Sequence, residues 1–264
     1  MSIRADRLSA NLSFIFTEWP FLDRFAAAAD AGFTCVEFLF PYAFDPELVG
    51  LRLEKNHLSV SVFNAPPGNW EAGERGLAAL PDRRDEFLQS IRFALTYAEA
   101  LHAKHIHVMA GIANARSIAA HAVYRDNLML AADLARDRQI QILVEPINPQ
   151  DMPGYFLQDF DSAERVVNTA APGVLGLQFD VYHCHKIHGS VIDRLIALLP
   201  MTAHMQIAGV PTRSEPAEPE LPLSELFAVL ESKRYPGRVG CEYRPAEGTL
   251  EGLGWITRLE ESLK

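Results

Sequence analysis

The sequence predicts an α/β fold, a single (β/α)8 (TIM) barrel domain that spans residues 1–264. Eight short apolar runs alternate with longer segments of helical character, a pattern typical of parallel βαβ units. The chain length fits such a barrel, which takes about 250 residues as one domain. The main alternative, a doubly wound open sheet, is disfavoured because no GxGxxG motif follows the first apolar run.

The expected strands are near-continuous apolar runs, as strands covered on both faces of a parallel sheet should be. Between them, apolar residues at three- to four-residue spacing predict helices over 87–101 and 223–230. Asp45 and Pro46 indicate the start of another helix, and Gly32 indicates the end of the one before it. In chain order, the expected strands cover residues 9–16, 34–40, 58–64, 105–109, 141–145, 175–180, 203–207 and 238–243.

Two loops are unusual. Residues 66–84 include the polar, glycine-rich stretch PPGNWEAGERG, and a loop this long in a compact domain is often a lid over a site. We therefore expect Trp70 to lie beside the substrate. Residues 210–222 contain four prolines, which disfavour helix and strand.

Composition excludes several partners. The formal net charge of -10 argues against nucleic acid, because phosphate binding needs a basic surface. No apolar run approaches the roughly 18 residues that span a bilayer, so we expect no membrane partner. The first residues do not resemble a signal peptide, and three widely separated cysteines argue against disulfides, which together favour a cytoplasmic protein. The oligomeric state stays open, a homo-oligomer included.

Oxygen-bearing side chains end four successive expected strands. The runs ILVE, LQFD, HMQ and VGCE carry Glu145, Asp180, Gln206 and Glu242 at their tips. In a barrel of this type the site lies at the C-terminal ends of the strands, which are about 4.8 Å apart. Alternation of side chains puts Gly240 on the same inward face as Glu242, and we expect this small residue to leave room at the mouth.

These four residues predict a metal site. Three facing carboxylates raise one another's pKa, and a bound cation removes that cost. Oxygen ligands alone favour a hard divalent ion, Mg²⁺ or Mn²⁺, over zinc. The alternative for any one of these acids is a structural role, in which it pairs with an arginine or caps a helix.

Two further features bear on the metal site. The run His183-Cys184-His185 suggests zinc, but strand-like alternation would turn Cys184 away from His183, and no CxxC pair is present. Glu37, in VEFLF, is a candidate for a fifth ligand. We interpret it as an acid that supports the site, because the four strand-end residues already make a complete set.

The segments around these residues resemble the hydroxypyruvate isomerase family, one branch of the xylose-isomerase-like barrels that also include ketose 3-epimerases and endonuclease IV. The similarity runs through nearly the whole chain, and its stretches at 63–76 and 145–157 are long and specific. The matching segments are ANLSFIFTEWPFLDRFAAAADAGF (10–33), FNAPPGNWEAGERG (63–76), HVMAGI (107–112), EPINPQDMPGYFL (145–157), QFDVYH (178–183), QIAGVP (206–211), GCEYRP (240–245) and GLGW (252–255).

The resemblance implies an isomerase that interconverts hydroxypyruvate and tartronate semialdehyde, a small-molecule substrate, with a divalent metal. Glu145 and Glu242 correspond to the two acid/base glutamates of the family, which are also metal ligands. Asp180 and Gln206 correspond to the remaining ligands. The same resemblance leaves open a 2-oxo-tetronate isomerase or a ketose 3-epimerase. The negative charge disfavours a nuclease of the endonuclease IV type, and the presence of both glutamates disfavours a non-catalytic sugar-binding barrel.

Three more residues take roles from the resemblance. His183 resembles a histidine that contacts the substrate, and Arg213 an arginine that meets its anionic or hydroxyl end. Asp151 lies where related epimerases place a second acid near the substrate. The sequence departs from the family after Arg213: a histidine is missing before Glu215, and PELPL (219–223) replaces a Gly-Glu-(Ile or Leu)-Asn-Tyr stretch. We expect the changed loop to shape the far end of the substrate site.

Overall fold

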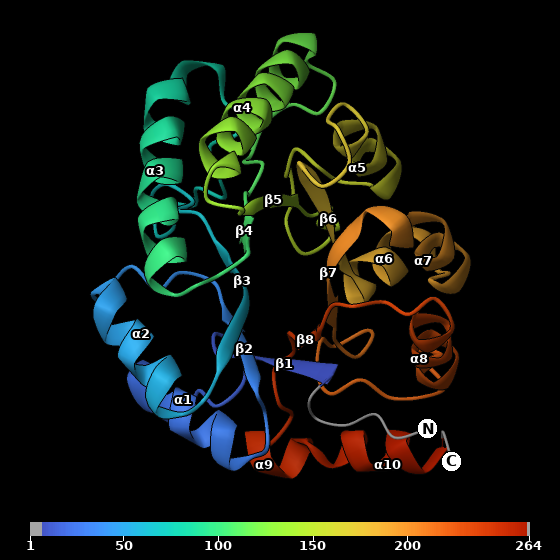
Figure 1. The fold of residues 1–264 in the computed structure, drawn as a ribbon. Helices are drawn as coiled ribbons and strands as arrows, with labels where there is room; N and C mark the ends of the chain where they lie inside the picture. The colour runs from blue at the N-terminus through green and yellow to red at the C-terminus, as the bar shows by residue number, and fades with distance from the viewer. Residues whose placement is uncertain (1–6, 263–264) are drawn as a thin grey trace.

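Eight parallel strands close into a barrel, with helices around the outside (Figure 1). The computed structural model describes residues 7–262. Each strand pairs with the next in chain order, and β1 also pairs with β8, which confirms the predicted (β/α)8 fold. The strands are β1 (Leu8–Asn11), β2 (Cys35–Phe38), β3 (Ser59–Asn64), β4 (His105–His107), β5 (Gln141–Val144), β6 (Leu175–Asp180), β7 (Thr202–Ile207) and β8 (Val239–Cys241).

Helices connect the strands, and their ends follow the predicted signals. Asp45 accepts a hydrogen bond from the Glu47 amide at 2.8 Å, and Pro46 is the first residue of α2. Gly32, just after α1, has a φ of +92°, a conformation that glycine adopts without strain. The helices are α1 (Phe21–Asp30), α2 (Pro46–Lys55), η2 (Pro81–Arg83), α3 (Arg84–Ala100), α4 (Ile118–Arg136), α5 (Phe160–Val167), α6 (Val181–His188), α7 (Ile192–Leu198), η3 (Leu199–Met201), α8 (Leu223–Ser232), α9 (Thr249–Gly252) and α10 (Gly254–Ser262).

The extent of the domain, residues 1–264, stays a prediction. The barrel and its helices occupy residues 7–262, whereas residues 1–6 and 263–264 lie outside the described residues. Among the described helices, none is long and apolar enough to cross a membrane.

The first expected strand, residues 9–16, was too long. β1 ends at Asn11, whose carbonyl accepts hydrogen bonds from the amides of Phe14 and Ile15 and starts a turn. Phe16 lies in the left-handed region with a φ of +59°, which a strand does not allow. Leu12, Ile15 and Phe16 belong to this turn region, and all three are buried. Burial, and not strand pairing, explains the apolar run.

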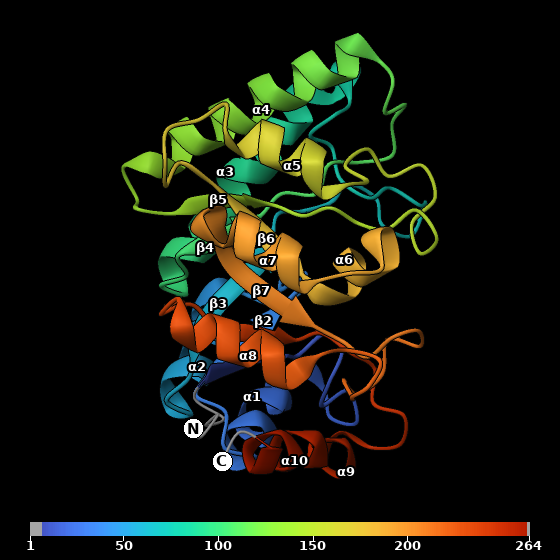
Figure 2. The same ribbon diagram turned by 90° about the vertical axis from the view of Figure 1, so that its right-hand side faces the viewer.

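Polar side chains occupy part of the barrel interior. Glu37 of β2 lies 2.8 Å from both His204 and Gln206 of β7. Since β2 and β7 are not neighbours in the sheet, these contacts cross the inside of the barrel. Apolar side chains fill the space between the sheet and the helices, as where Phe25 of α1 packs on Phe38 of β2. Figure 2 shows the barrel from the side, with the loops that follow the strands gathered at one end.

Candidate active site

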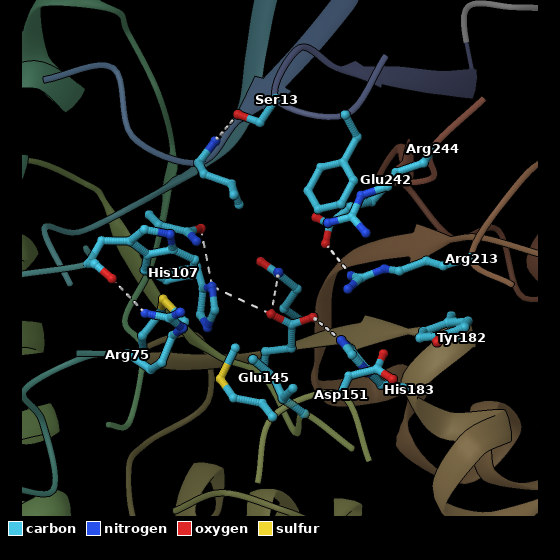
Figure 3. A pocket seen from close by; sticks show the side chains of 18 of the residues that line it. Ser13, Arg75, His107, Glu145, Asp151, Tyr182, His183, Arg213, Glu242 and Arg244 are labelled. Atoms are coloured by element: carbon cyan, nitrogen blue, oxygen red, sulfur yellow. Dashed lines mark hydrogen bonds and ion pairs between the residues drawn. The ribbon is translucent and has the colours of Figure 1, made fainter. Parts of the chain in front are cut away.

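A cavity of about 890 Å³ opens where the strands end (Figure 3). Six of the predicted site residues line it: Trp70, Glu145, Asp151, His183, Arg213 and Glu242. The other two, Asp180 and Gln206, are buried beside it. Several other charged or polar lining residues had no predicted catalytic or binding role, among them Asn64, Arg75, Gln178 and Arg244. The predicted residues therefore converge on one place, although they come from separate parts of the chain.

Asp180 and Gln206 are partners in the register of β6 and β7. Asp180 also caps helix α6, since its Oδ1 accepts a hydrogen bond from the Tyr182 amide at 2.8 Å. Its Oδ2 is buried and has no hydrogen-bond partner among residues 7–262. Burial raises the pKa of Asp180 to about 6, although the nearby Arg213 opposes the rise. One oxygen of this carboxylate thus serves the fold, and the other is available to the site.

Glu145 lies one residue beyond β5, between two histidines (Figure 3). Its Oε2 accepts a hydrogen bond from Gln178 Nε2 at 3.1 Å and lies 3.5 Å from His107 Nδ1. Its Oε1 is buried and without a hydrogen-bond partner in the described chain. Burial, together with the negative charges of Glu242 and Asp180, raises the pKa of Glu145 well above its ordinary value.

Two amides connect Glu145 to Glu242. Gln178 Nε2 donates to Glu145 and also to Gln206 Oε1, the second bond being 2.7 Å long. Gln206 Nε2 in turn donates to Glu242 Oε2. Gln178 lies two residues before Asp180 on β6, so side-chain alternation places both on the same face, but no role was predicted for Gln178. The two glutamates of strands five and eight are therefore held in one hydrogen-bonded chain.

Glu242 is paired with a cation. Its Oε1 lies 2.5 Å from Arg213 Nη2, and the same nitrogen lies 3.5 Å from Asp180 Oδ2. Burial raises the pKa of Glu242 to about 8, with Arg213 acting against the rise. The guanidinium carbon of Arg213 lies 5.1 Å from the ring centroids of both Phe14 and Tyr182. This aromatic sandwich, typical of cation–π contacts, fixes the arginine over the two carboxylates.

Glu37 supports the site from inside the barrel. Its Oε1 accepts hydrogen bonds from Asn11 and Gln206, at 3.0 and 2.8 Å, and both of these amides also donate to Glu242. The interpretation of Glu37 as a supporting acid agrees with these contacts. Gly240, however, does not leave open space at the mouth, because a Cβ atom there would lie 2.3 Å from Glu37 Oε2. The glycine instead makes room for the buried carboxylate.

The residues present fit a divalent metal ion. Glu145, Asp180 and His183 each offer a ligand atom, and these atoms lie within 4.8 Å of one another. The two buried oxygens without hydrogen-bond partners in the described chain, Glu145 Oε1 and Asp180 Oδ2, belong to this group. Glu242 lies against Arg213 instead, and Gln206 uses its oxygen for Gln178. Two buried carboxylate oxygens without hydrogen-bond partners in the described chain suit a hard cation, which prefers oxygen ligands.

Residues 183–185 belong to helix α6, not to a strand, so the alternation expected there was wrong. Zinc is disfavoured at this run for a different reason. Cys184 is buried away from the cavity wall, with its Sγ 3.8 Å from the Ser190 carbonyl. Burial raises the pKa of Cys184 to about 12, which disfavours the thiolate that a metal needs. His183 alone of this run lines the cavity.

The outer wall of the cavity is aromatic and basic. Trp70 packs on Phe40 at 5.2 Å between ring centroids, and the Arg75 guanidinium lies 3.8 Å from its ring centroid. Burial and the carboxylate of Asp151 raise the pKa of Tyr182 to about 12. The expectation that the loop at 214–223 shapes the substrate site was wrong: Thr212 and Arg213 line the cavity, but residues 214–223 do not. Glu215 instead accepts hydrogen bonds from the Ala246 amide, outside the cavity.

Known proteins are similar to this chain over nearly its whole length. The family model described as xylose isomerase-like TIM barrel matches residues 25–259. A 2-oxo-tetronate isomerase of Cupriavidus necator is 47% identical over 252 residues, which cover 95% of this chain and 97% of that protein. The hydroxypyruvate isomerase of Escherichia coli is 39% identical over 252 residues, which cover 95% of this chain and 98% of that protein.

A solved structure is also similar over nearly the whole chain. The protein described as AP endonuclease, family 2, from Brucella melitensis is 42% identical and superimposes with a TM-score of 0.92, covering 96% of this chain and 98% of that chain. Both the sequence matches and the fold therefore extend well beyond the residues of the cavity. The chain belongs to the hydroxypyruvate isomerase family of the xylose isomerase-like TIM barrels, and it is an isomerase.

Proposed function

We propose that this isomerase interconverts hydroxypyruvate and tartronate semialdehyde by proton transfer through an enediolate. The observation that carries the proposal is that Glu145, Glu242 and Arg213 line one cavity. Two buried glutamates supply an acid and a base, and the arginine supplies a fork of donors for a carboxylate. The 39% identity to the Escherichia coli hydroxypyruvate isomerase supports the same substrate.

We assign a divalent ion, Mg²⁺ or Mn²⁺, to Glu145, Asp180, Gln206 and Glu242. The free oxygens Glu145 Oε1 and Asp180 Oδ2 support this assignment, and Gln206 and Glu242 lie next to them in the same hydrogen-bonded chain. When bound, the ion supplies positive charge that stabilises the negative oxygens of the enediolate. In the metal-free site, repulsion from Glu242 and Asp180 contributes to the raised pKa of Glu145. A bound cation would relieve this repulsion.

The two glutamates then move the protons. In the direction from hydroxypyruvate, one glutamate takes a proton from carbon 3, and the electron pair of that C–H bond forms the C2–C3 double bond of the enediolate. The other returns a proton to carbon 2, while the hydroxyl proton on the carbon 3 oxygen moves to the oxygen on carbon 2. Which glutamate acts first depends on the direction of the reaction. The row of hydrogen bonds from Glu145 through Gln178 and Gln206 to Glu242 keeps both carboxylates in place during these steps.

The remaining predicted residues bind and shield the substrate. We assign the substrate carboxylate to Arg213, which is half-buried and contacts the rings of Phe14 and Tyr182. His183 and Asp151 donate to or accept from the substrate hydroxyls, and the loop of Trp70 covers the site and excludes water. His107, beside Glu145, is buried, and its burial lowers its pKa to about 3. Its neutral ring adds no positive charge next to the base.

The test is a substrate panel with the purified protein and added Mg²⁺ or Mn²⁺. Hydroxypyruvate, 2-oxo-tetronate and free ketoses such as fructose would be compared by kcat/KM. We expect turnover of the 2-oxo acids and no epimerisation of the ketoses. If the protein converted ketoses but none of the 2-oxo acids, the proposal would be wrong and a ketose 3-epimerase would replace it.

A second candidate substrate is 2-oxo-tetronate, with one more carbon. Two observations favour it: the cavity of about 890 Å³ far exceeds the needs of a three-carbon acid, and a 2-oxo-tetronate isomerase is 47% identical to this chain. Arg75 and Arg244 at the outer wall offer donors for a longer chain. The ratio of kcat/KM for the two acids in the panel decides between them.

Three predicted properties remain part of this proposal. We expect no nucleic-acid substrate, because the net charge is -10, even though the similar Brucella melitensis protein is described as an endonuclease. DNA with an abasic site, added to the panel, should therefore stay intact. A cytoplasmic location and assembly into a homo-oligomer also stay predictions, which cell fractionation and light scattering would test.

A further inference from the structure

His183 has a buried partner outside the predicted site. Asn148, which is fully buried in the loop after β5, places its Nδ2 atom 2.8 Å from His183 Nδ1. Its backbone N–H also points at the same ring nitrogen, at 3.4 Å. Asn148 belongs to the stretch EPINPQDMP, but no role was predicted for it.

The orientation of the Asn148 side chain is determined by its other end. Its Oδ1 atom accepts hydrogen bonds from the backbone amides of Gln150 and Asp151, at 3.1 and 3.0 Å. Both of these partners can only donate, so the oxygen must face them and the nitrogen must face His183. The positions of the two amide atoms therefore follow from the chemistry of the neighbours.

The same logic determines the proton on the ring. A nitrogen that accepts hydrogen bonds from two N–H groups carries no proton, so Nδ1 of His183 is unprotonated. The imidazole is then neutral, and its proton is on Nε2. That nitrogen lies 3.6 Å from Asp180 Oδ2 and 3.9 Å from Glu145 Oε1. Nε2–H thus points toward the two carboxylate oxygens assigned to the metal.

A protonated Nε2 has no lone pair to give to a metal ion. Geometry alone would count His183 as a third ligand with Glu145 and Asp180, within 4.8 Å. With its proton on Nε2, the ring instead offers a hydrogen bond to an oxygen held at the same place. In the proposed reaction, the oxygens that become negative in the enediolate are of this kind, and a fixed donor stabilises such charge.

We infer that Asn148 is a positioning residue that holds His183 as the Nε2–H tautomer, which makes His183 a hydrogen-bond donor to the substrate oxygen and keeps it out of the metal's ligand set. The donor role toward substrate rests on the proposed function. The tautomer itself does not, because it depends only on contacts between protein groups.

The tautomer can be measured on metal-free protein labelled with ¹⁵N in its histidines. Two-bond ¹H–¹⁵N correlation spectra distinguish protonated from unprotonated ring nitrogens, and loss of one set of signals in His183→Gln identifies His183. We expect Nε2 to be protonated and Nδ1 unprotonated. A wild-type spectrum with the proton on Nδ1, or on both nitrogens at neutral pH, would overturn the inference without any further variant.

Asn148→Asp tests the cause. The carboxylate keeps one oxygen for the amides of Gln150 and Asp151 and turns the other toward Nδ1, which must then carry the proton. We expect the tautomer to reverse and kcat to fall by about 10²-fold, as on loss of one oxyanion donor. Asn168→Asp, the same change at an exposed position, is the matched control and should alter neither.

Metal affinity separates this role from simple structural support. In Asn148→Asp the lone pair on Nε2 faces the site, so Mn²⁺ should bind as tightly as in wild type or more tightly, while kcat is lost. Weaker Mn²⁺ binding with an unchanged tautomer would mean that Asn148 only supports the loop, and the inference would be wrong. If no 2-oxo acid is converted at all, the proposed function fails, but the spectra still decide the tautomer.

Discussion

Arg213 Nη2 lies 2.5 Å from Oε1 of Glu242, so the arginine that we assign to the substrate carboxylate directly contacts one of the two glutamates that we propose as acid and base. The same arginine is 3.5 Å from Asp180. Its backbone is constrained. It has a φ of +57°, its amide donates a hydrogen bond to the Gly209 carbonyl, and its carbonyl accepts one from the Arg244 amide. If the proposed roles hold, substrate binding by Arg213 is coupled directly to the charge of Glu242.

Substitution of Arg213 should affect acids more than neutral sugars. In Arg213→Ala, we expect kcat/KM for hydroxypyruvate to fall by about 10²-fold or more, since a buried charge pair broken on one side costs about 2–5 kcal/mol. Arg213→Lys should recover only part of the activity, because lysine keeps the charge and loses the fork. Arg125→Ala, at an exposed position, is the control. Equal losses on 2-oxo acids and on ketoses would contradict the assignment.

The two glutamates should each be essential. Glu145→Gln and Glu242→Gln keep the shape of the side chain and remove its basicity, so we expect kcat to fall by about 10²- to 10⁴-fold. Exchange of the substrate C–H proton with D₂O, followed by NMR, reports on the first proton transfer separately. Glu99→Gln, exposed on helix α3, controls for the change of charge. Near wild-type activity of either variant with metal present would remove that residue from the mechanism.

Stability of the metal-free protein should decrease as pH rises. Burial raises the pKa of Asp180 to about 6 and of Glu242 to about 8, both above the ordinary values of 3.8 and 4.5. A carboxyl whose folded pKa is raised stabilises the fold fully below its unfolded pKa, and this contribution is lost as pH rises through the folded value. We therefore expect the Tm to fall between about pH 4 and pH 8.

Two comparisons isolate this effect. In Glu242→Gln the decrease in Tm with pH should be smaller, because one of the ionising groups is gone. Added Mn²⁺ should raise the Tm of wild type more at high pH than at low pH, since protons compete with the metal for the same carboxylates. If the Tm of wild type and of Glu242→Gln rose equally with pH, ionisation of Asp180 and Glu242 would not destabilise the fold, and the prediction would be wrong.

Glu37 should matter for stability as well as for the site. Glu37→Leu removes one hydrogen-bond acceptor from each of Asn11, Ser61, His204 and Gln206, and a buried donor left unpaired costs about 1–3 kcal/mol. Gly240→Ala should act in the same direction, because its Cβ would displace the Glu37 carboxylate. Urea unfolding measures the free energy of unfolding, with Glu99→Gln as the control. Wild-type stability of Glu37→Leu would disprove the supporting role.

Trp70 should contribute to substrate binding. The residue is 37% exposed at the outer wall of the cavity, and its ring contacts Phe40 and the guanidinium of Arg75. In Trp70→Ala we expect KM to rise severalfold with little change in Tm, because little buried surface is lost. Leu51→Ala, at an exposed site on α2 away from the cavity, should leave KM unchanged. A fall in kcat alone would instead assign the loop to the chemical step.

The sequence by itself determined the barrel and the side chains at its mouth. Each buried strand is a local apolar run, and each run places its last residue at the same end of the sheet, so Glu145, Asp180, Gln206 and Glu242 could be found by counting. The start of α2 at Asp45 and the end of α1 near Gly32 could also be predicted, because capping depends on neighbours in the chain.

Only the tertiary structure decided how these groups are paired. The contacts Arg213–Glu242, Glu37–His204 and Asn148–His183 join residues that are 29, 167 and 35 positions apart. No periodicity in the chain records such pairs, since they depend on where strands and loops meet across the barrel. The helix at 181–188 likewise placed His183 by helical geometry, because the Asp180 side chain that ends β6 also caps α6. The identity of the site residues is thus local information, and the state of each one depends on hydrogen bonds from distant parts of the fold.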